Sequence, residues 1–157
     1  MSNPVTITAP EGTPFIDIVR EFDAPVDAVF AAYADPELVK QWLGPNGYEM
    51  TVDEYSLTTG GRYRYVHSSP AGDSFAFNGV FHVVRPNELI VQTFEFEGIP
   101  DVASLESLRF HDLGDGRTRL TGHSVFPSIE ARDGMIANGM ERGVVEGYER
   151  LDALLAA

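Results

Sequence analysis

Apolar and polar residues recur with two different periods along this chain, and the change of period divides it into segments. Phe15–Phe22 is short and rich in β-branched and aromatic residues, which predicts a strand. Asp23-Ala24-Pro25 then places a proline at the start of a helix, whose apolar residues from Val26 to Tyr33 share one face. A second short helix is predicted over Asp35–Trp42, and Gly44–Gly47 ends it.

From Tyr48 to Phe126 the period changes to two, which is typical of strands. Turn sequences rich in Gly, Pro, Asn and Asp divide this stretch into about six strands, and such short connections favour antiparallel pairing. The helical period returns from about Gly134 to Leu155 and predicts a long C-terminal helix. The predicted fold class is therefore α+β, in the order strand, two helices, about six strands and a helix that covers a curved antiparallel sheet.

Strand alternation also predicts which side chains face that helix. Glu49 and Asp53 fall on the opposite face of one strand and Arg62 and Arg64 on that of the next, which suits ion pairing across strands in solvent. The inward positions carry most of the aromatic residues. They are Tyr48, Met50, Val52, Tyr63, Tyr65, His67, Phe75, Phe77, Gly79, Phe81, Val83, Ile90, Phe94, Phe96, Glu106, Leu108, Phe110, Thr118 and Leu120.

Composition narrows the classes of partner. The chain has 24 acidic and 11 basic residues and a formal charge of -13, so its field repels nucleic acid and anionic membranes, which we do not expect as partners. It has no cysteine, which excludes disulfides, thiol nucleophiles and cysteine-ligated zinc. We see neither a signal peptide nor an apolar run of the roughly 20 residues that cross a bilayer. Cytoplasmic localisation is expected.

A length of 157 residues suits one domain with a single core. We expect residues 1–13 to be a loosely ordered N-terminal segment and residues 14–157 to form that domain.

Several motifs together resemble a known superfamily. They are Arg20-Glu21-Phe22-x-Ala24-Pro25, Asp35-Pro36-Glu37, Trp42-x-Gly44-Pro45, Gly60-Gly61-Arg62-Tyr63, Gly79-x-Phe81, Gly116-x-Thr118 and Gly139-Met140-x-x-Gly143. The chain resembles the SRPBCC superfamily, in particular its branch similar to the activator of heat-shock-protein-ninety ATPase. That resemblance implies the helix-grip fold, also called START-like or birch-pollen-allergen-like, in which a seven-stranded antiparallel sheet wraps around a long C-terminal helix and encloses a cavity. Polyketide cyclases and lipid-transfer domains are similar.

The aromatic inward face is the main functional signal, because a curved sheet under one helix can enclose a mostly apolar cavity. Ordinary core packing of these aromatic residues is the alternative. His67 and Glu106 are polar residues on that face and could orient a carbonyl group or move a proton. Two structural alternatives stay open: His67 is solvated at the sheet end, or Glu106 pairs with Arg20. The candidate ligand-binding residues are Trp42, Tyr48, Met50, Tyr63, Tyr65, His67, Phe77, Phe81, Phe94, Phe96, Glu106, Leu108, Met135, Met140 and Val144.

We find no motif that specifies a catalytic residue, a metal site or a cofactor. His82, His111 and His123 lack metal-ligand spacing, no serine sits in a Gly-x-Ser-x-Gly elbow, and Gly114-Asp115-Gly116 reads as a hairpin turn rather than a phosphate loop. The favoured function is binding of a small hydrophobic or aromatic molecule. The alternatives are a co-chaperone-like module that binds a chaperone or other protein, and a polyketide cyclase/aromatase-like enzyme.

Three glycines at Gly139, Gly143 and Gly147 recur along the predicted C-terminal helix, where each costs about 1 kcal/mol relative to alanine. They indicate close approach of another segment. We favour a segment of the same chain over a second subunit, and both a monomer and a homodimer stay possible.

Overall fold

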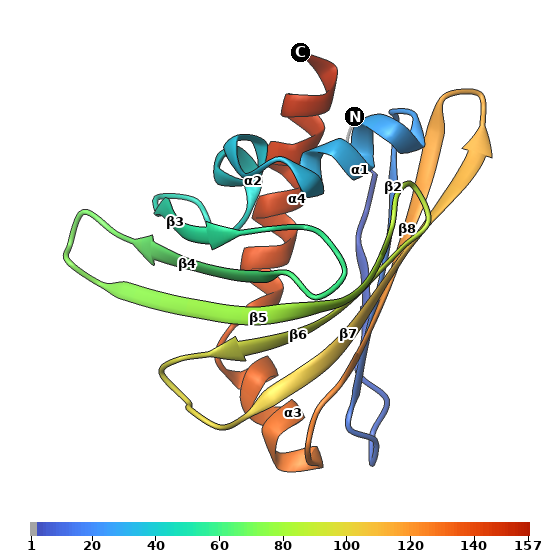
Figure 1. The fold of residues 1–157 in the computed structure, drawn as a ribbon. Helices are drawn as coiled ribbons and strands as arrows, with labels where there is room; N and C mark the ends of the chain where they lie inside the picture. Colours follow the sequence, from blue (N-terminus) through green and yellow to red (C-terminus); the bar gives the residue numbers. More distant parts are fainter. Residues whose placement is uncertain (1–2) are drawn as a thin grey trace.

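An antiparallel sheet curls around the C-terminal helix in the computed structural model, which describes residues 3–157 (Figure 1). In chain order the elements are β1 Thr6–Thr8, β2 Phe15–Phe22, α1 Val26–Ala34, α2 Pro36–Trp42, β3 Glu49–Tyr55, β4 Arg62–Ser68, β5 Ser74–Arg85, β6 Leu89–Phe96, β7 Ala103–Gly114, β8 Arg117–Val125, α3 Ile129–Ala137 and α4 Met140–Ala156. The α+β class and the helix-grip arrangement are as predicted. Within residues 3–157 we find no helix with the length and apolarity that a membrane span requires.

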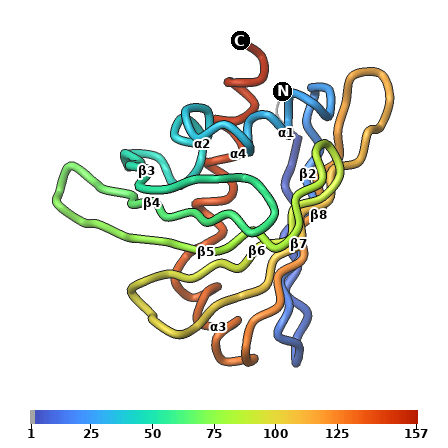
Figure 2. Tube along the Cα trace, viewed as in Figure 1, coloured from blue at the N-terminus to red at the C-terminus, as the bar shows by residue number. Residues whose placement is uncertain are grey.

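The sheet has eight strands rather than the expected seven, in the order β1-β2-β8-β7-β6-β5-β4-β3. The additional strand is β1, whose residues pair antiparallel with Asp17–Val19 of β2. It lies within the N-terminal segment expected to be loosely ordered, and Figure 2 shows the dark blue trace of these residues running beside β2. Three residues are too few for a clear alternation, so the sequence pattern did not reveal this strand.

The C-terminal helical region is two helices, not the single helix predicted from about Gly134. Helix α3 ends at Ala137, and α4 begins after Gly139, which caps it with a left-handed φ of 80°. Only glycine adopts that conformation without steric cost, so Gly139 interrupts the helix instead of forming part of a helical glycine stripe. Ser128 caps the start of α3, since its hydroxyl accepts a hydrogen bond from the Ala131 amide.

The predicted strand faces are largely confirmed. Tyr63, Tyr65 and His67 are buried on the concave side of β4, whereas Arg64 between them points outward and pairs with Asp53 and with Glu97. Because these ion pairs lie on the outer face, the neighbouring aromatic residues of β4 lie on the concave face.

Two irregularities shift the alternation. In β3 the register shifts between Val52 and Glu54, so Tyr55 pairs with Tyr63 and faces inward. In β5 it shifts between Phe81 and Val83, and Val84 rather than the predicted Val83 packs against the core. A bulge adds one residue to a strand and thereby reverses the facing of those that follow.

Helix α4 is tied to the sheet through a buried ion pair. The Arg20 side chain on β2 is 2% exposed and donates to both carboxylate oxygens of Asp152, at 2.9 and 2.6 Å. Its guanidinium carbon also lies 4.8 Å from the ring centroid of Phe22 and 5.9 Å from that of Tyr148. The sequence alternative that paired Arg20 with Glu106 is therefore wrong.

The helix also packs closely against the end of α2. A Cβ added at Gly147 would lie 3.1 Å from the carbonyl oxygen of Trp42, which accepts a 2.8 Å hydrogen bond from Arg150. At Gly143 the nearest atom to such a Cβ is Pro45 Cδ, at 3.8 Å. The close approach that we expected is thus within one chain, but it occurs at Gly147 and against α2.

Replacing Asp152 by asparagine should lower the free energy of unfolding by about 3 kcal/mol, because it leaves the buried Arg20 guanidinium without a counter-charge. Urea unfolding followed by the fluorescence of the single tryptophan, Trp42, measures the loss. The matched control Asp53→Asn breaks an exposed pair and should cost less than about 1 kcal/mol. Equal losses in the two variants would contradict the anchoring role.

The two helical glycines should respond differently to alanine. Gly143→Ala should raise the free energy of unfolding by about 1 kcal/mol, since alanine favours a helix and its methyl group meets only ordinary contacts. Gly147→Ala should lose that gain and destabilise the protein, because the methyl group presses on a carbonyl held by Arg150. Thermal unfolding of both variants tests this, and a stabilised Gly147→Ala would refute the close packing.

Candidate ligand-binding cavity

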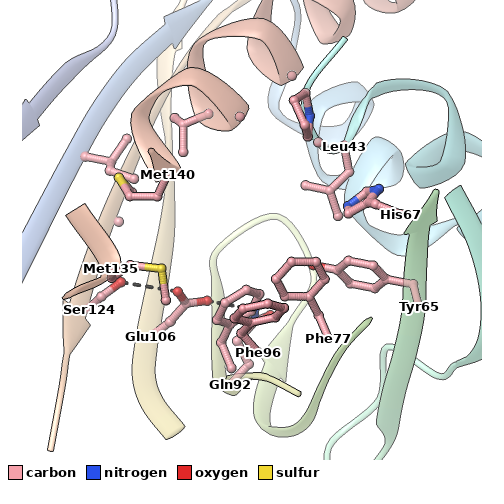
Figure 3. A pocket seen from close by; sticks show the side chains of 18 of the residues that line it. Leu43, Tyr65, His67, Phe77, Gln92, Phe96, Glu106, Ser124, Met135 and Met140 are labelled. Carbon is pink, nitrogen blue, oxygen red and sulfur yellow. Dashed lines mark hydrogen bonds between the residues drawn. The ribbon is translucent and has the colours of Figure 1, made fainter. Parts of the chain in front are cut away.

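A cavity of about 660 Å³ lies between the concave face of the sheet, helices α3 and α4, and the loop that follows α2. Every candidate residue named from the sequence lines it except Met50, which packs against the core instead. Figure 3 shows opposite walls of the cavity, with Met135 and Met140 on one side and Tyr65 and Phe77 on the other. The predicted alternation of side chains along the strands therefore identified the face of the sheet that lines the cavity.

One wall is a continuous aromatic surface. The ring of Phe77 lies 5.5 Å from Tyr65, 5.3 Å from Phe94 and 5.2 Å from Phe96, measured between centroids. Three strands, β4, β5 and β6, supply these residues at paired positions, such as Tyr65 opposite Phe77 and Phe77 opposite Phe96. The wall offers both ring faces and ring edges to a bound molecule.

Several tyrosine hydroxyls around the cavity are already used within the protein. Tyr63 donates to the Thr93 carbonyl at 2.6 Å, and Tyr55 donates to the Tyr33 carbonyl at 2.6 Å. Burial raises the pKa values of both phenols, so they stay protonated. The Tyr63 hydroxyl is therefore already paired within the protein, although the ring of Tyr63 lines the cavity.

Glu106 is the carboxyl group of the cavity, and it belongs to a row of polar residues across three strands. Gln92 on β6 and Ser124 on β8 are its register partners on either side. Gln92 Nε2 donates to one carboxyl oxygen at 3.0 Å, and Ser124 Oγ donates to the other at 3.3 Å. Burial raises the pKa of Glu106, and these two hydrogen bonds only partly oppose the shift.

Sequence reasoning missed Gln92 and Ser124, although a signal was present. Gln92 has the parity of Ile90 and Phe94, and Ser124 has that of Leu120, so both were inward positions. Other lining residues come from outside the alternating region or follow a bulge, and no strand pattern marks them. They include Tyr33, Tyr55, Leu43, Pro45 and Tyr148.

His67 is buried in the cavity wall rather than solvated. The side chain is 6% exposed, packs against the rings of Tyr65 and Phe77, and is covered by Gly44. Its Nδ1 atom has no hydrogen-bond partner among the described residues. Burial, aided by the positive charge of Arg150, lowers the pKa of His67 to about 4, so the imidazole is neutral at physiological pH. His67 and Glu106 share this cavity but lie on different walls (Figure 3).

A second cavity of about 330 Å³ adjoins the first beside α3 and the loop at Ile99. Both cavities are lined by Phe94, Phe96, Phe126 and Met135. Ile99, in the Gly98-Ile99-Pro100 loop, lines this adjoining space, whereas Trp42 is only 3% exposed and lies inside the protein.

The described residues 3–157 contain no group of three or more His, Asp or Glu side chains placed to hold a metal ion. The polar chemistry of the cavity comes from Glu106 with its two donors and from His67.

The family model described as "Activator of Hsp90 ATPase homolog 1-like protein" matches residues 23–156. Protein Ms6760 from Mycobacterium smegmatis is 29% identical, with 97% of each chain covered and a TM-score of 0.87. A Rhodobacter sphaeroides protein is 26% identical over 98% of this chain and 99% of that one, with a TM-score of 0.87. An Arthrobacter aurescens protein is 28% identical over 96% and 91% of the two chains, also at 0.87. No curated protein matches the chain.

The neutral state of His67 should make folding stability depend on pH. Because its pKa is about 4 when folded and about 6.5 when unfolded, the unfolded chain binds more protons between these values. The free energy of unfolding should therefore fall by roughly 3 kcal/mol through this group as pH drops from 6.5 to 4.

Urea unfolding at a series of pH values measures this dependence. The fall should be smaller by about that amount in His67→Leu than in the original protein, whereas the exposed control His82→Leu should leave it unchanged. Identical pH profiles for His67→Leu and the original protein would show that His67 is not held neutral by burial.

Proposed function

Because the chain belongs to the Activator of Hsp90 ATPase homolog 1-like family, as its sequence motifs suggested, we propose that it binds a small hydrophobic or aromatic molecule in the cavity under helix α4. The observation that carries this proposal is the cavity of about 660 Å³, lined mainly by aromatic and aliphatic side chains. Ligand sites in proteins commonly measure about 300 to 1,000 Å³ and combine such walls with a few polar groups.

The arrangement of the walls supports an aromatic or similarly flat ligand. Tyr65, Phe77, Phe94 and Phe96 form a surface on which a ring can stack or meet ring edges. Met135 and Met140 lie across the cavity, and their flexible thioethers adapt to varied apolar shapes. The row of Gln92, Glu106 and Ser124 supplies the point at which one polar group of the ligand is oriented.

Binding is favoured over the two other functions for structural reasons. An acid–base enzyme of the cyclase type would use Glu106 and His67 together, and the two side chains lie on different walls (Figure 3). A co-chaperone-like module would use an outer surface, whereas the cavity of about 660 Å³ that supports binding is internal. Turnover of a bound molecule, or a complex formed through outer-face residues, would each support one of those alternatives.

A neutral fluorescent probe of apolar pockets, N-phenyl-1-naphthylamine, should bind saturably with one site per chain. Val144→Trp should weaken that binding by about tenfold or more, because the indole would occupy space on the α4 side of the cavity. Val80→Trp is the matched control: it adds the same side chain on the outer face of β5 and should leave binding unchanged.

Fluorescence titration of the three proteins, each checked for a cooperative thermal transition, gives the dissociation constants. Absence of saturable binding, or equal weakening by both tryptophans, would overturn the proposal.

A further inference from the structure

Glu106 lacks a cationic partner among the described residues. Its hydrogen bonds come from the neutral donors Gln92 and Ser124. Arg20, the buried cation on β2, already donates to both oxygens of Asp152. A carboxylate in an apolar cavity is costly when no positive charge accompanies it, and residues 3–157 place no such charge next to Glu106.

The other titratable groups around the cavity do not provide a positive charge to Glu106. The four phenols that sense the charge of Glu106 are buried and have raised pKa values, so they stay neutral; they are Tyr33, Tyr63, Tyr65 and Tyr148. His67 is neutral at physiological pH. The two remaining basic side chains of the lining are engaged elsewhere: Arg142 is exposed and pairs with Glu146, and His123 pairs with Asp17 at 2.6 Å.

Three features of the molecule complement a cation. The first is the carboxyl group of Glu106, which has no cationic partner among the described residues. The second is the aromatic wall, because the faces of Phe and Tyr rings attract cations that lie within about 6 Å. The third is the formal charge of -13, which draws cations toward the protein and repels anions. An apolar acid such as a fatty acid would place its carboxylate against Glu106, which is unfavourable.

Resting on the proposed function, we propose that the ligand of this cavity is an apolar or aromatic amine whose protonated nitrogen pairs with Glu106. The ammonium group donates hydrogen bonds to the carboxylate oxygens beside Gln92 and Ser124, and the hydrocarbon part of the ligand lies against Phe77, Phe94 and Phe96. A neutral alcohol of the same size fits the same space but leaves the carboxyl group without a counter-charge.

This pairing has a consequence for protons. Without a ligand, burial holds the pKa of Glu106 above its ordinary value, whereas a neighbouring ammonium group lowers it. Binding of the amine should therefore release a proton from Glu106 where that group is partly protonated, and amine affinity should rise with pH until Glu106 is fully ionised. Binding of the alcohol should show neither effect.

Calorimetric titration with 4-phenylbutylamine and 4-phenylbutanol tests the proposal, because the two probes differ in the terminal group alone. The original protein should bind the amine about tenfold more tightly than the alcohol at neutral pH. Glu106→Gln keeps the size of the side chain and should weaken amine binding by about tenfold while changing alcohol binding by less than about twofold. The matched control Glu49→Gln removes a charge from the exposed face of β3 and should change neither.

The outcomes separate the two proposals. Equal or tighter binding of the alcohol, or amine binding unaffected by Glu106→Gln, overturns the amine inference and leaves the binding function standing. If neither probe binds while N-phenyl-1-naphthylamine does, the amine inference is likewise overturned and the binding function stands. Failure of all three overturns the proposed function itself. If Glu106→Gln does not fold, titrations of the original protein in buffers of different ionisation enthalpy, at a series of pH values from about 4.5 to neutral, decide the matter, since absence of proton release on amine binding throughout that range contradicts the pairing.

Discussion

The structure depends on how helix α4 is held. Its C-terminal half is fixed by the ion pair of Asp152 with Arg20, by the buried residues Tyr148 and Leu151, and by the tight approach of Gly147 to the end of α2. Its N-terminal half carries Met140 and Val144, which line the cavity. A helix anchored at one end spans the curved sheet without filling it, and this separation creates the space for a ligand.

The sheet contributes the complementary constraint. Bulges in β3 and β5 turn Tyr55 and Val84 toward the core cluster, and Tyr55 also lines the cavity. Phe77, Phe94 and Phe96 face the cavity, as do the core residues Tyr63, Tyr65 and Phe81. Core and cavity therefore share one concave surface of the sheet.

Burial has opposite effects on the two ionisable groups of interest in the cavity. It raises the pKa of the Glu106 carboxyl and lowers that of the His67 imidazole, because in each case the charged form is the one that loses solvation. Burial thus shifts the protonation equilibrium of each residue toward its neutral form. Glu106 differs from His67 in having two donors already arranged around its oxygens, which prepares it to carry a charge when a cation arrives.

The sequence by itself determined the fold class, the family and, up to the bulges in β3 and β5, the side of each strand that faces the cavity. Those properties follow from local periodicity: side chains alternate along a strand wherever it is placed, so the inward aromatics and Glu106 were identifiable without a structure. The tertiary structure alone decided the partners of these side chains. Arg20 binds Asp152 rather than Glu106, Tyr63 donates to Thr93, and Gln92 and Ser124 flank Glu106. Such choices depend on strand register and on residues far apart in the chain, and a local pattern contains neither.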